Sequence, residues 1–125
     1  MSRGVFFVAL AALAGPAFAE TAYFDDIPDL PMPAGFVEAD TASGFQGGQG
    51  RLVFAEATGR GDGPAVRDFY QDTLPQLGWS ESVENGALVF QRGRERLHLF
   101  LIREEAGVLR LRVQLTVRPA SMNAD

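Results

Sequence analysis

Only one stretch of this sequence has the pattern of an amphipathic helix, and it limits what the rest of the chain can fold into. The stretch runs from Asp62 to Trp79. Asp62 can cap the first free backbone N–H groups, and Pro64 suits the first turn, where a missing donor costs nothing. The apolar residues that follow recur at spacings of three and four, and they are Val66, Phe69, Tyr70, Leu74 and Leu77. The sequence therefore predicts one helix with a single core-facing side.

The end of this helix is marked as clearly as its start. Pro75 removes a backbone donor and crowds the preceding turn, so we expect a regular helix to Leu74 and a tightened last turn. Gly78 suits the left-handed residue that stops a helix. Trp79 should then begin a strand and cover the end of the helix.

Strand patterns and short turns dominate the sequence after the helix. The pair 85–86, Asn-Gly, is the favoured two-residue turn and places Val83 opposite Leu88. A second two-residue turn at 92–93 places Leu88 opposite Leu97, and Phe90 opposite Glu95. These two turns predict three antiparallel strands.

The last strand alternates between apolar and polar residues over 108–118. A three-residue turn at 105–107, with Gly107 left-handed, places Leu101 opposite Leu111. The three turns together put apolar side chains on one face, where the helix must pack. The other face then carries the pairs His98 with Gln114, Phe100 with Arg112, Ile102 with Arg110, and Arg96 with Thr116.

That polar face is the first candidate binding surface, and its residues are Arg96, His98, Phe100, Arg110, Arg112 and Gln114. Guanidinium groups around a histidine and a phenylalanine can bind a carboxylate, a phosphate group or an acidic peptide. The plainer interpretation is a solvated sheet face with Arg112 stacked on Phe100.

Two strands are expected before the helix, over 36–46 and 51–58, joined by the glycine-rich segment 47–50. A phosphate cradle there is disfavoured, because no helix follows the glycines and the sequence has no lysine. In the second of these strands Leu52 and Phe54 share one face, and Val53 and the following alanines share the other. Both faces are apolar, which indicates a strand covered on both sides or one beside the preceding segment.

Residues 20–35 form a proline-rich segment that we call the strap. Three prolines within six residues exclude a helix and favour an extended chain. Its apolar side chains could lie along the domain or dock on a partner. The strap therefore supplies the second set of candidate partner-binding residues, which are Phe24, Asp25, Asp26 and Asp29. The clustered carboxylates raise the question of a divalent cation, but the glycine turn of a calcium loop is absent, so we expect no metal.

Residues 1–19 have the features of a secretory signal peptide, with a small-x-small cleavage site after Ala19. We therefore expect a periplasmic or secreted protein without stable membrane insertion after cleavage. Residues 20–125 hold sixteen acidic residues and ten arginines, a net charge of −6, which disfavours nucleic acid as a partner. The charge is uneven, because residues 82–125 hold seven of those arginines and five of the acids.

The sequence lacks the residues that several catalytic mechanisms require. His98 is the only histidine and there is no cysteine, which excludes thiol mechanisms and histidine-rich zinc sites. No G-x-S-x-G elbow is present to make His98 the base of a serine hydrolase. We expect no enzyme activity and no cofactor.

The helix end FYxxxLPxLGW, from Phe69 to Trp79, and the segment from Tyr23 to Phe36 together resemble small exported proteobacterial proteins, many of unknown function. The similarity covers most of residues 20–125. It implies an envelope protein of α+β fold and brings no catalytic motif with it.

The sequence thus predicts a signal peptide (1–19), the strap (20–35), a single α+β domain (36–118) and a flexible C-terminal tail (119–125). The domain should hold a mainly antiparallel sheet of five or six strands, in the order β-β-α-β-β-β-β, with the helix on one face. We expect a non-catalytic module that binds an envelope protein partner. The alternative is a small-ligand or lipid carrier whose pocket lies between helix and sheet, lined by Phe54, Phe69, Leu99 and Val113.

Overall fold

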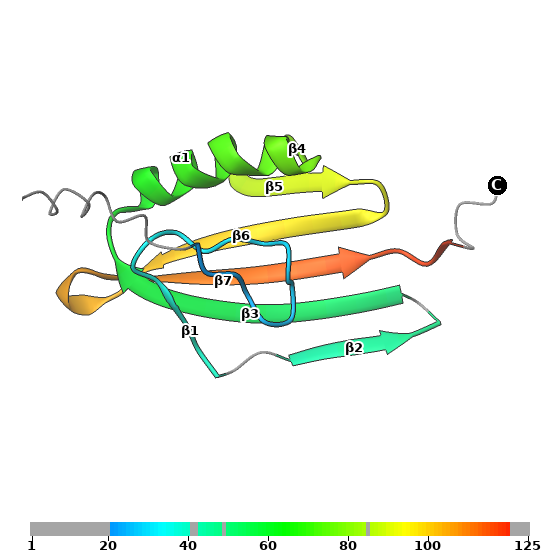
Figure 1. The fold of residues 1–125 in the computed structure, drawn as a ribbon, viewed down its shortest axis with the longest axis horizontal. Coiled ribbons are helices and arrows are strands. Elements are labelled where there is room, and N and C mark those ends of the chain that lie inside the picture. The colour runs from blue at the N-terminus through cyan, green and yellow to red at the C-terminus, as the bar shows by residue number, and fades with distance from the viewer. Residues whose placement is uncertain (1–20, 41–42, 49, 85, 121–125) are drawn as a thin grey trace, which may run out of the picture.

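The computed structural model describes residues 21–40, 43–48, 50–84 and 86–120, which form a seven-stranded antiparallel sheet with one helix (Figure 1). The strands are β1 (Val37–Glu38), β2 (Ser43–Gly47), β3 (Gly50–Arg60), β4 (Ser80–Glu84), β5 (Ala87–Arg92), β6 (Glu95–Arg103) and β7 (Val108–Val117). The sheet order is β1-β3-β7-β6-β5-β4, and β2 also pairs with β3. The predicted α+β class and antiparallel sheet are confirmed, with seven strands in place of five or six.

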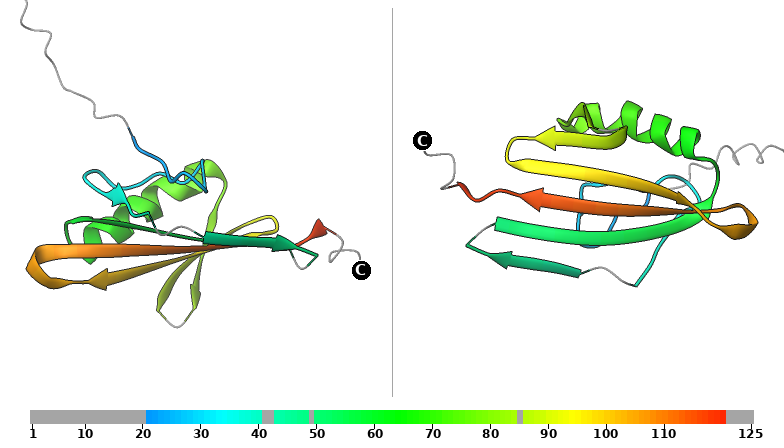
Figure 2. Two further views of the ribbon diagram at one scale, coloured as in Figure 1. Left: turned by 90° about the horizontal axis from the view of Figure 1, so that it is seen from below. Right: turned by 180° about the vertical axis from the view of Figure 1, so that it is seen from behind.

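The helix and the strap cover the same face of the sheet, which we call the inner face (Figure 2). The helix consists of α1 (Gly63–Thr73) and a 3₁₀ turn, η2 (Leu74–Leu77). The strap lies beside the helix, on the same side of the strands. The opposite face, which we call the outer face, is covered by no helix or strap within the described residues.

The helix begins and ends as predicted. The Asp62 carboxylate accepts a hydrogen bond from the backbone N–H of Ala65 at 2.7 Å, and Gly78 has a φ of 95°. Trp79 is buried, and β4 starts at the residue after it. The predicted core position of Leu77 is wrong, because its side chain is 40% exposed. Leu77 lies in the 3₁₀ turn, whose tighter winding rotates it off the apolar stripe.

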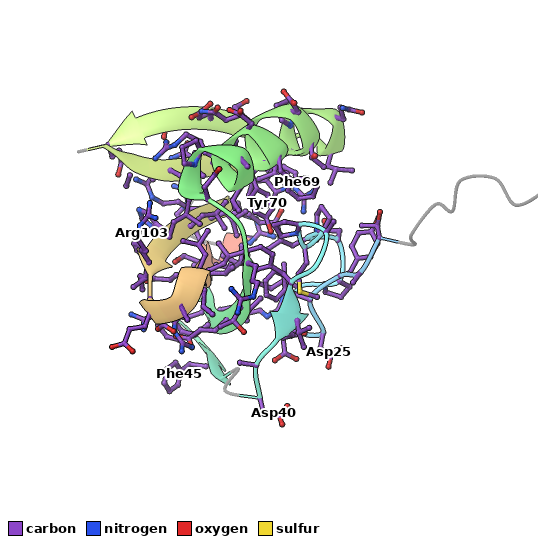
Figure 3. The ribbon with its side chains drawn as sticks, turned by 90° about the vertical axis from the view of Figure 1, so that its left-hand side faces the viewer. Asp25, Asp40, Phe45, Phe69, Tyr70 and Arg103 are labelled. Atoms are coloured by element: carbon purple, nitrogen blue, oxygen red, sulfur yellow. The ribbon has the colours of Figure 1, made fainter. Side chains whose placement is uncertain are left out.

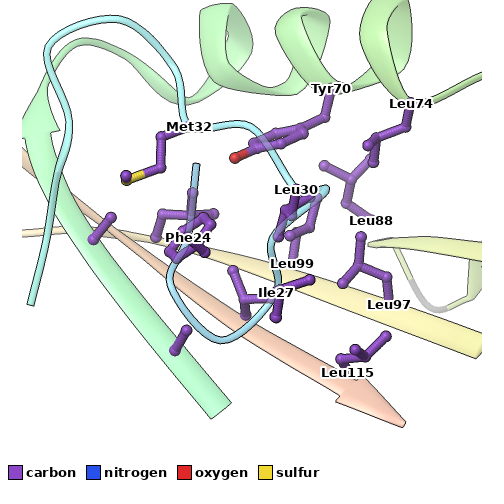
Figure 4. Packing of buried hydrophobic residues seen from close by; sticks show 14 of the residues in the cluster. Phe24, Ile27, Leu30, Met32, Tyr70, Leu74, Leu88, Leu97, Leu99 and Leu115 are labelled. Carbon is purple, nitrogen blue, oxygen red and sulfur yellow. The ribbon is translucent and has the colours of Figure 1, made fainter. Parts of the chain in front are cut away.

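The strap is part of the hydrophobic core. Its buried side chains are Phe24, Ile27, Leu30 and Met32, and Figure 4 shows them in the space between the helix and the sheet. The Tyr70 hydroxyl of the helix donates to the Pro31 carbonyl oxygen at 2.7 Å. Burial raises the pKa of the Tyr70 phenol, so this group remains a donor. Of the two interpretations of the strap, docking within the chain is therefore the one observed.

Arg92 joins the strap, the helix end and the sheet. Its guanidinium donates to the carboxylate of Asp29 in the strap at 2.7 Å and to that of Glu95 at 2.8 Å. It also donates to the Leu77 carbonyl oxygen at 3.0 Å, at the end of the helix. The same group lies 4.3 Å from the centroid of the Trp79 ring. One side chain thus fixes three parts of the chain relative to each other.

Strand β3 makes room for the strap with small residues on its inner side. Ala55 and Ala57 are fully buried. At Gly59 a Cβ would stand 2.6 Å from a ring carbon of Phe36, so the aromatic ring occupies the place of a side chain. Both faces of β3 carry apolar side chains, but only the inner face is covered. The inner side chains pack under the strap, whereas the outer ones are partly exposed.

Two of the three predicted turn registers are confirmed. Val83 pairs with Leu88, and Leu101 pairs with Leu111. Gly107 is left-handed with a φ of 75°, as expected, and so is Ala106, with a φ of 61°. Non-glycine residues seldom adopt that conformation, and no sequence signal marked it.

The predicted register between β5 and β6 is wrong. Gly93 and Arg94 form the turn, because Arg92 pairs with Glu95. Gly93 has a φ of 58°, which suits the first central position of a type II′ turn. Leu88 consequently pairs with Leu99 and Phe90 with Leu97, in place of the expected Leu97 and Glu95. The shift is two residues, so the same side chains still face inward, and the apolar pattern alone does not distinguish the two registers.

The first predicted strand is divided into two. Val37 pairs with Thr58 in β1, whereas Ser43 pairs with Phe54 in β2, so the register changes by two residues between them. The glycine-rich hairpin is confirmed, with Gly47 opposite Gly50. The signal peptide at 1–19 with its cleavage site, Asn85 of the second hairpin and residues 121–125 of the tail lie outside the described residues.

Substitution of Gly59 by alanine tests the close packing on β3 of Phe36, the residue that directly follows the strap. The added methyl group collides with the Phe36 ring, so we expect the free energy of unfolding to fall by about 1–3 kcal/mol. Gly47→Ala is the matched control, because a Cβ there meets nothing within 4 Å. Urea denaturation of both variants measures the difference, and equal stability of the two would contradict this packing.

Candidate partner-binding face

The outer face brings together all six of the sheet residues predicted as a binding surface. The outward-facing residues of the three central strands are Leu52, Phe54, Glu56 and Thr58 from β3, Arg110, Arg112, Gln114 and Thr116 from β7, and Arg96, His98, Phe100 and Ile102 from β6. The four predicted cross-strand pairs are confirmed, from Arg96 with Thr116 to Ile102 with Arg110. The alternation of β7 and the three-residue turn at 105–107 were sufficient to place them.

The strap residues of the candidate set lie on the other side of the sheet. Phe24 is 1% exposed, so its side chain offers a partner no surface. Asp25 and Asp26 are exposed and line an acidic hollow of about 280 Å³ together with Glu38 and Asp40. Asp29 is bound to Arg92. The two candidate sets therefore do not form one site.

Glu56 is the residue of the outer face that the sequence did not reveal. One carboxylate oxygen accepts from Arg110 at 3.0 Å and the other from Arg112 at 2.8 Å. Glu104 also accepts from Arg110, at 2.6 Å. The charges of Arg110 and Arg112 are therefore already paired with carboxylates of the chain. The missing signal was the position of β3, since Glu56 faces Arg112 only because β3 pairs with β7.

The carboxylates of this cluster are held in the ionised form. The hydrogen bond from Arg112 is the main cause that lowers the pKa of Glu56 below its ordinary value. The bond from Arg110 does the same for the pKa of Glu104, and the bond from Arg96 for the pKa of Glu84. Such groups act as fixed charges, not as proton donors near neutral pH.

A second ion pair bridges the outer face near its β4 edge. Arg96 of β6 donates to Glu84 of β4, across the intervening strand β5. Val89 lies between them on β5, opposite His98, and it is fully buried although it faces outward. The register places this ion pair diagonally across Val89, which explains that burial. The Ser82 hydroxyl beside Val89 is also buried and has no hydrogen-bond partner among the described residues.

The aromatic stacking on this face differs from the one expected. The ring of Phe100 stacks on that of His98, with centroids 5.7 Å apart and an angle of 7° between planes. The expected stack of Arg112 on Phe100 is not formed, because Glu56 draws the Arg112 guanidinium toward β3. His98 therefore has an aromatic ring on one side and Val89 and Gln114 as its cross-strand neighbours.

The described part of the chain holds neither a metal cluster nor a membrane-spanning helix. No group of three or more acidic or histidine side chains there is arranged to hold a metal ion. No helix in residues 21–40, 43–48, 50–84 and 86–120 combines the length and apolar character needed to cross a membrane.

Comparison with known proteins adds no relative. No protein-family profile, no curated protein and no solved structure matches this chain. The resemblance to small exported proteobacterial proteins therefore stays a prediction.

Removal of the Glu56 carboxylate tests the ion cluster through its pH dependence. Glu56→Gln should lower the free energy of unfolding by roughly 1 kcal/mol at about pH 7. The folded-state pKa lies below the ordinary value of 4.5, so this contribution is present above that value and is lost as the pH falls through the lower one. The stability difference between wild type and variant should therefore be smaller at pH ~3 than at pH ~7.

Denaturant titrations at the two pH values measure this difference. Glu105→Gln is the control, because Glu105 is exposed and makes no ion pair within the described residues. A loss for Glu56→Gln that is the same at both pH values would contradict an electrostatic role.

Proposed function

We propose that this protein is a non-catalytic binding module of the cell envelope, and that it holds a protein partner on the outer face of its sheet. The supporting observation is the unequal covering of the two faces. The helix and the strap occupy the inner face, whereas the outer face carries apolar side chains with no described element over them.

Apart from Val89, the large apolar residues of the outer face are only partly buried. Leu52, Phe54, Phe100 and Ile102 are half-buried, and Phe45 of β2 is 65% exposed. In Figure 3 the Phe45 side chain stands away from the body of the molecule. Aromatic and aliphatic side chains set among arginines are typical of protein interfaces, where they form the contact core.

The chemistry of the face favours binding over catalysis. Glu56, Glu84 and Glu104 are each bound to an arginine that lowers the carboxyl pKa, so none is poised to exchange a proton. His98 is stacked on Phe100, and the nearby Glu84 carboxylate is bound to Arg96 and makes no hydrogen bond to the imidazole. A surface of fixed charges and apolar groups therefore favours binding of a partner over chemical conversion of a substrate.

The packing argues against a carrier with a pocket between helix and sheet. The strap side chains Phe24, Ile27 and Leu30 fill the space where such a ligand would lie. Phe54, expected to line that pocket, pairs with Gln114 and faces outward. A ligand between the layers would first have to displace the strap.

Photo-crosslinking in the native host tests the proposed face. A photoreactive phenylalanine analogue replaces Phe54 or Phe100, with little change of shape. We expect each to give an adduct of defined mass with an envelope protein, because both rings are part of the partly exposed outer surface.

The same analogue at Gln76 or Leu77, exposed on the helix, provides the control. Adducts from the helix positions and none from the outer face would contradict the proposal, because the partner would then contact the helix side of the molecule. A strap deletion is not a useful control, because it removes core side chains.

A further inference from the structure

A cationic hollow lies on the outer face, where the β5–β6 turn meets the end of β7. Its volume is about 290 Å³, and it is lined by Gln91, Gly93, Arg94, Glu95, Arg96, Thr116 and Arg118. Gln91, Arg96 and Thr116 form one cross-strand row, so the hollow opens on the outer side of the sheet. This size, near the lower limit for ligand sites, suits a small group and not a large cofactor.

Two of the three arginines in this hollow are not neutralised by a described residue. Arg96 is bound to Glu84. Arg94 donates to the backbone carbonyl oxygen of Arg118, a contact that does not neutralise the Arg94 charge. Neither Arg94 nor Arg118 has a carboxylate within ion-pair distance among the described residues. The carboxylate of Glu95 is turned to Arg92. The hollow therefore attracts an anion.

The backbone holds the two arginines side by side. The N–H of Arg118 donates to the carbonyl oxygen of Arg94 at 3.0 Å, which extends the pairing of β6 and β7 beyond the strands. This bond brings both side chains to the rim of the same hollow, and a planar guanidinium can donate a pair of hydrogen bonds to a carboxylate.

The same cross-strand row is apolar at its other end. From the hollow it runs from Arg96 to Thr116, then to Leu52 on β3 and to Phe45 on β2. Phe54 lies two residues beyond Leu52 on the same side of β3. One end of the outer face thus presents cations, and the neighbouring edge presents partly exposed apolar side chains.

The spacing along this row defines what it can bind. Neighbouring strands are about 4.8 Å apart, so Phe45 on β2 lies roughly 10 Å across the sheet from β7, which leads into Arg118, and roughly 14 Å from β6, which follows Arg94. An extended peptide advances about 3.3 Å per residue, and its alternate side chains point the same way. An apolar and an acidic side chain about four residues apart would therefore reach both ends.

We infer that this row binds an extended acidic peptide segment, with a carboxylate at Arg94 and Arg118 and an apolar side chain on Phe45 and Leu52. The inference rests on the proposed function and names the chemistry of the partner segment. A nucleic acid suits the row less well, since residues 20–125 carry a net charge of −6 and half of the row is apolar. An acyl chain would need a deep apolar channel, whereas Phe45 is exposed on a strand surface.

Fluorescence anisotropy with a labelled synthetic peptide provides the test. The peptide carries one phenylalanine and one glutamate about four residues apart in a glycine–serine sequence, with both termini blocked. We expect saturable binding that weakens with added salt. Replacing the glutamate by glutamine, or bringing it next to the phenylalanine, should weaken binding about tenfold.

Variants of the protein locate the site. Arg94→Gln combined with Arg118→Gln should weaken binding about tenfold, and Phe45→Ser about fivefold. Arg103→Gln and Val37→Ser are the matched controls, because Arg103 lies at the far end of β6 and the exposed Val37 lies in β1. Both controls should bind as wild type does.

Three results would overturn the inference: no binding at millimolar peptide, equal binding of all three peptides, or equal loss in the control variants. Binding of phosphatidylglycerol vesicles but not of the peptide would also overturn it, in favour of a membrane surface. If peptide binding fails while the outer-face crosslinks persist, the proposed function stands and only this ligand class is wrong.

Discussion

The strap inserted between helix and sheet is the interaction on which the rest of the structure depends. The helix has only three fully buried residues, Val66, Tyr70 and Leu74, so it covers the sheet incompletely by itself. Each large apolar side chain of the strap contributes roughly 1.5–3 kcal/mol when buried. Four of them are together comparable with the whole stability of a domain, about 5–15 kcal/mol. The strap is therefore a structural element and not an appendage.

A strap docked in this way also decides which face of the sheet is left uncovered. It fills the inner face, and Tyr70 and Arg92 fix it there by bonds to Pro31 and Asp29. The outer face then holds the partly exposed apolar side chains and the cationic hollow at Arg94 and Arg118. Its central arginines are paired with carboxylates of the chain, whereas Arg94 and Arg118, which have no such partner among the described residues, lie toward one end of the sheet.

Local patterns in the sequence predicted most of the fold. The helix ends followed from Asp62 and Gly78, and the outer-face pairs followed from the turn at 105–107 and the alternation of β7. Two features could not be predicted from local patterns. The β5–β6 register was ambiguous by two residues, because both registers bury the same side chains. The pairing of β3 with β7 brings Glu56 to Arg112, and no local pattern specifies it.

Native-state hydrogen exchange of the strap amides tests the central claim, that the strap belongs to the core. The N–H groups of Leu30 and Met32 donate to the carbonyl oxygens of Ile27 at 2.9 Å and Ala22 at 2.8 Å. We expect these amides to exchange only with global unfolding, at the same opening free energy as Leu111 in the centre of β7. Rapid exchange of the strap amides while Leu111 stays protected would show that the strap is detached, and would contradict this structure's account of its core.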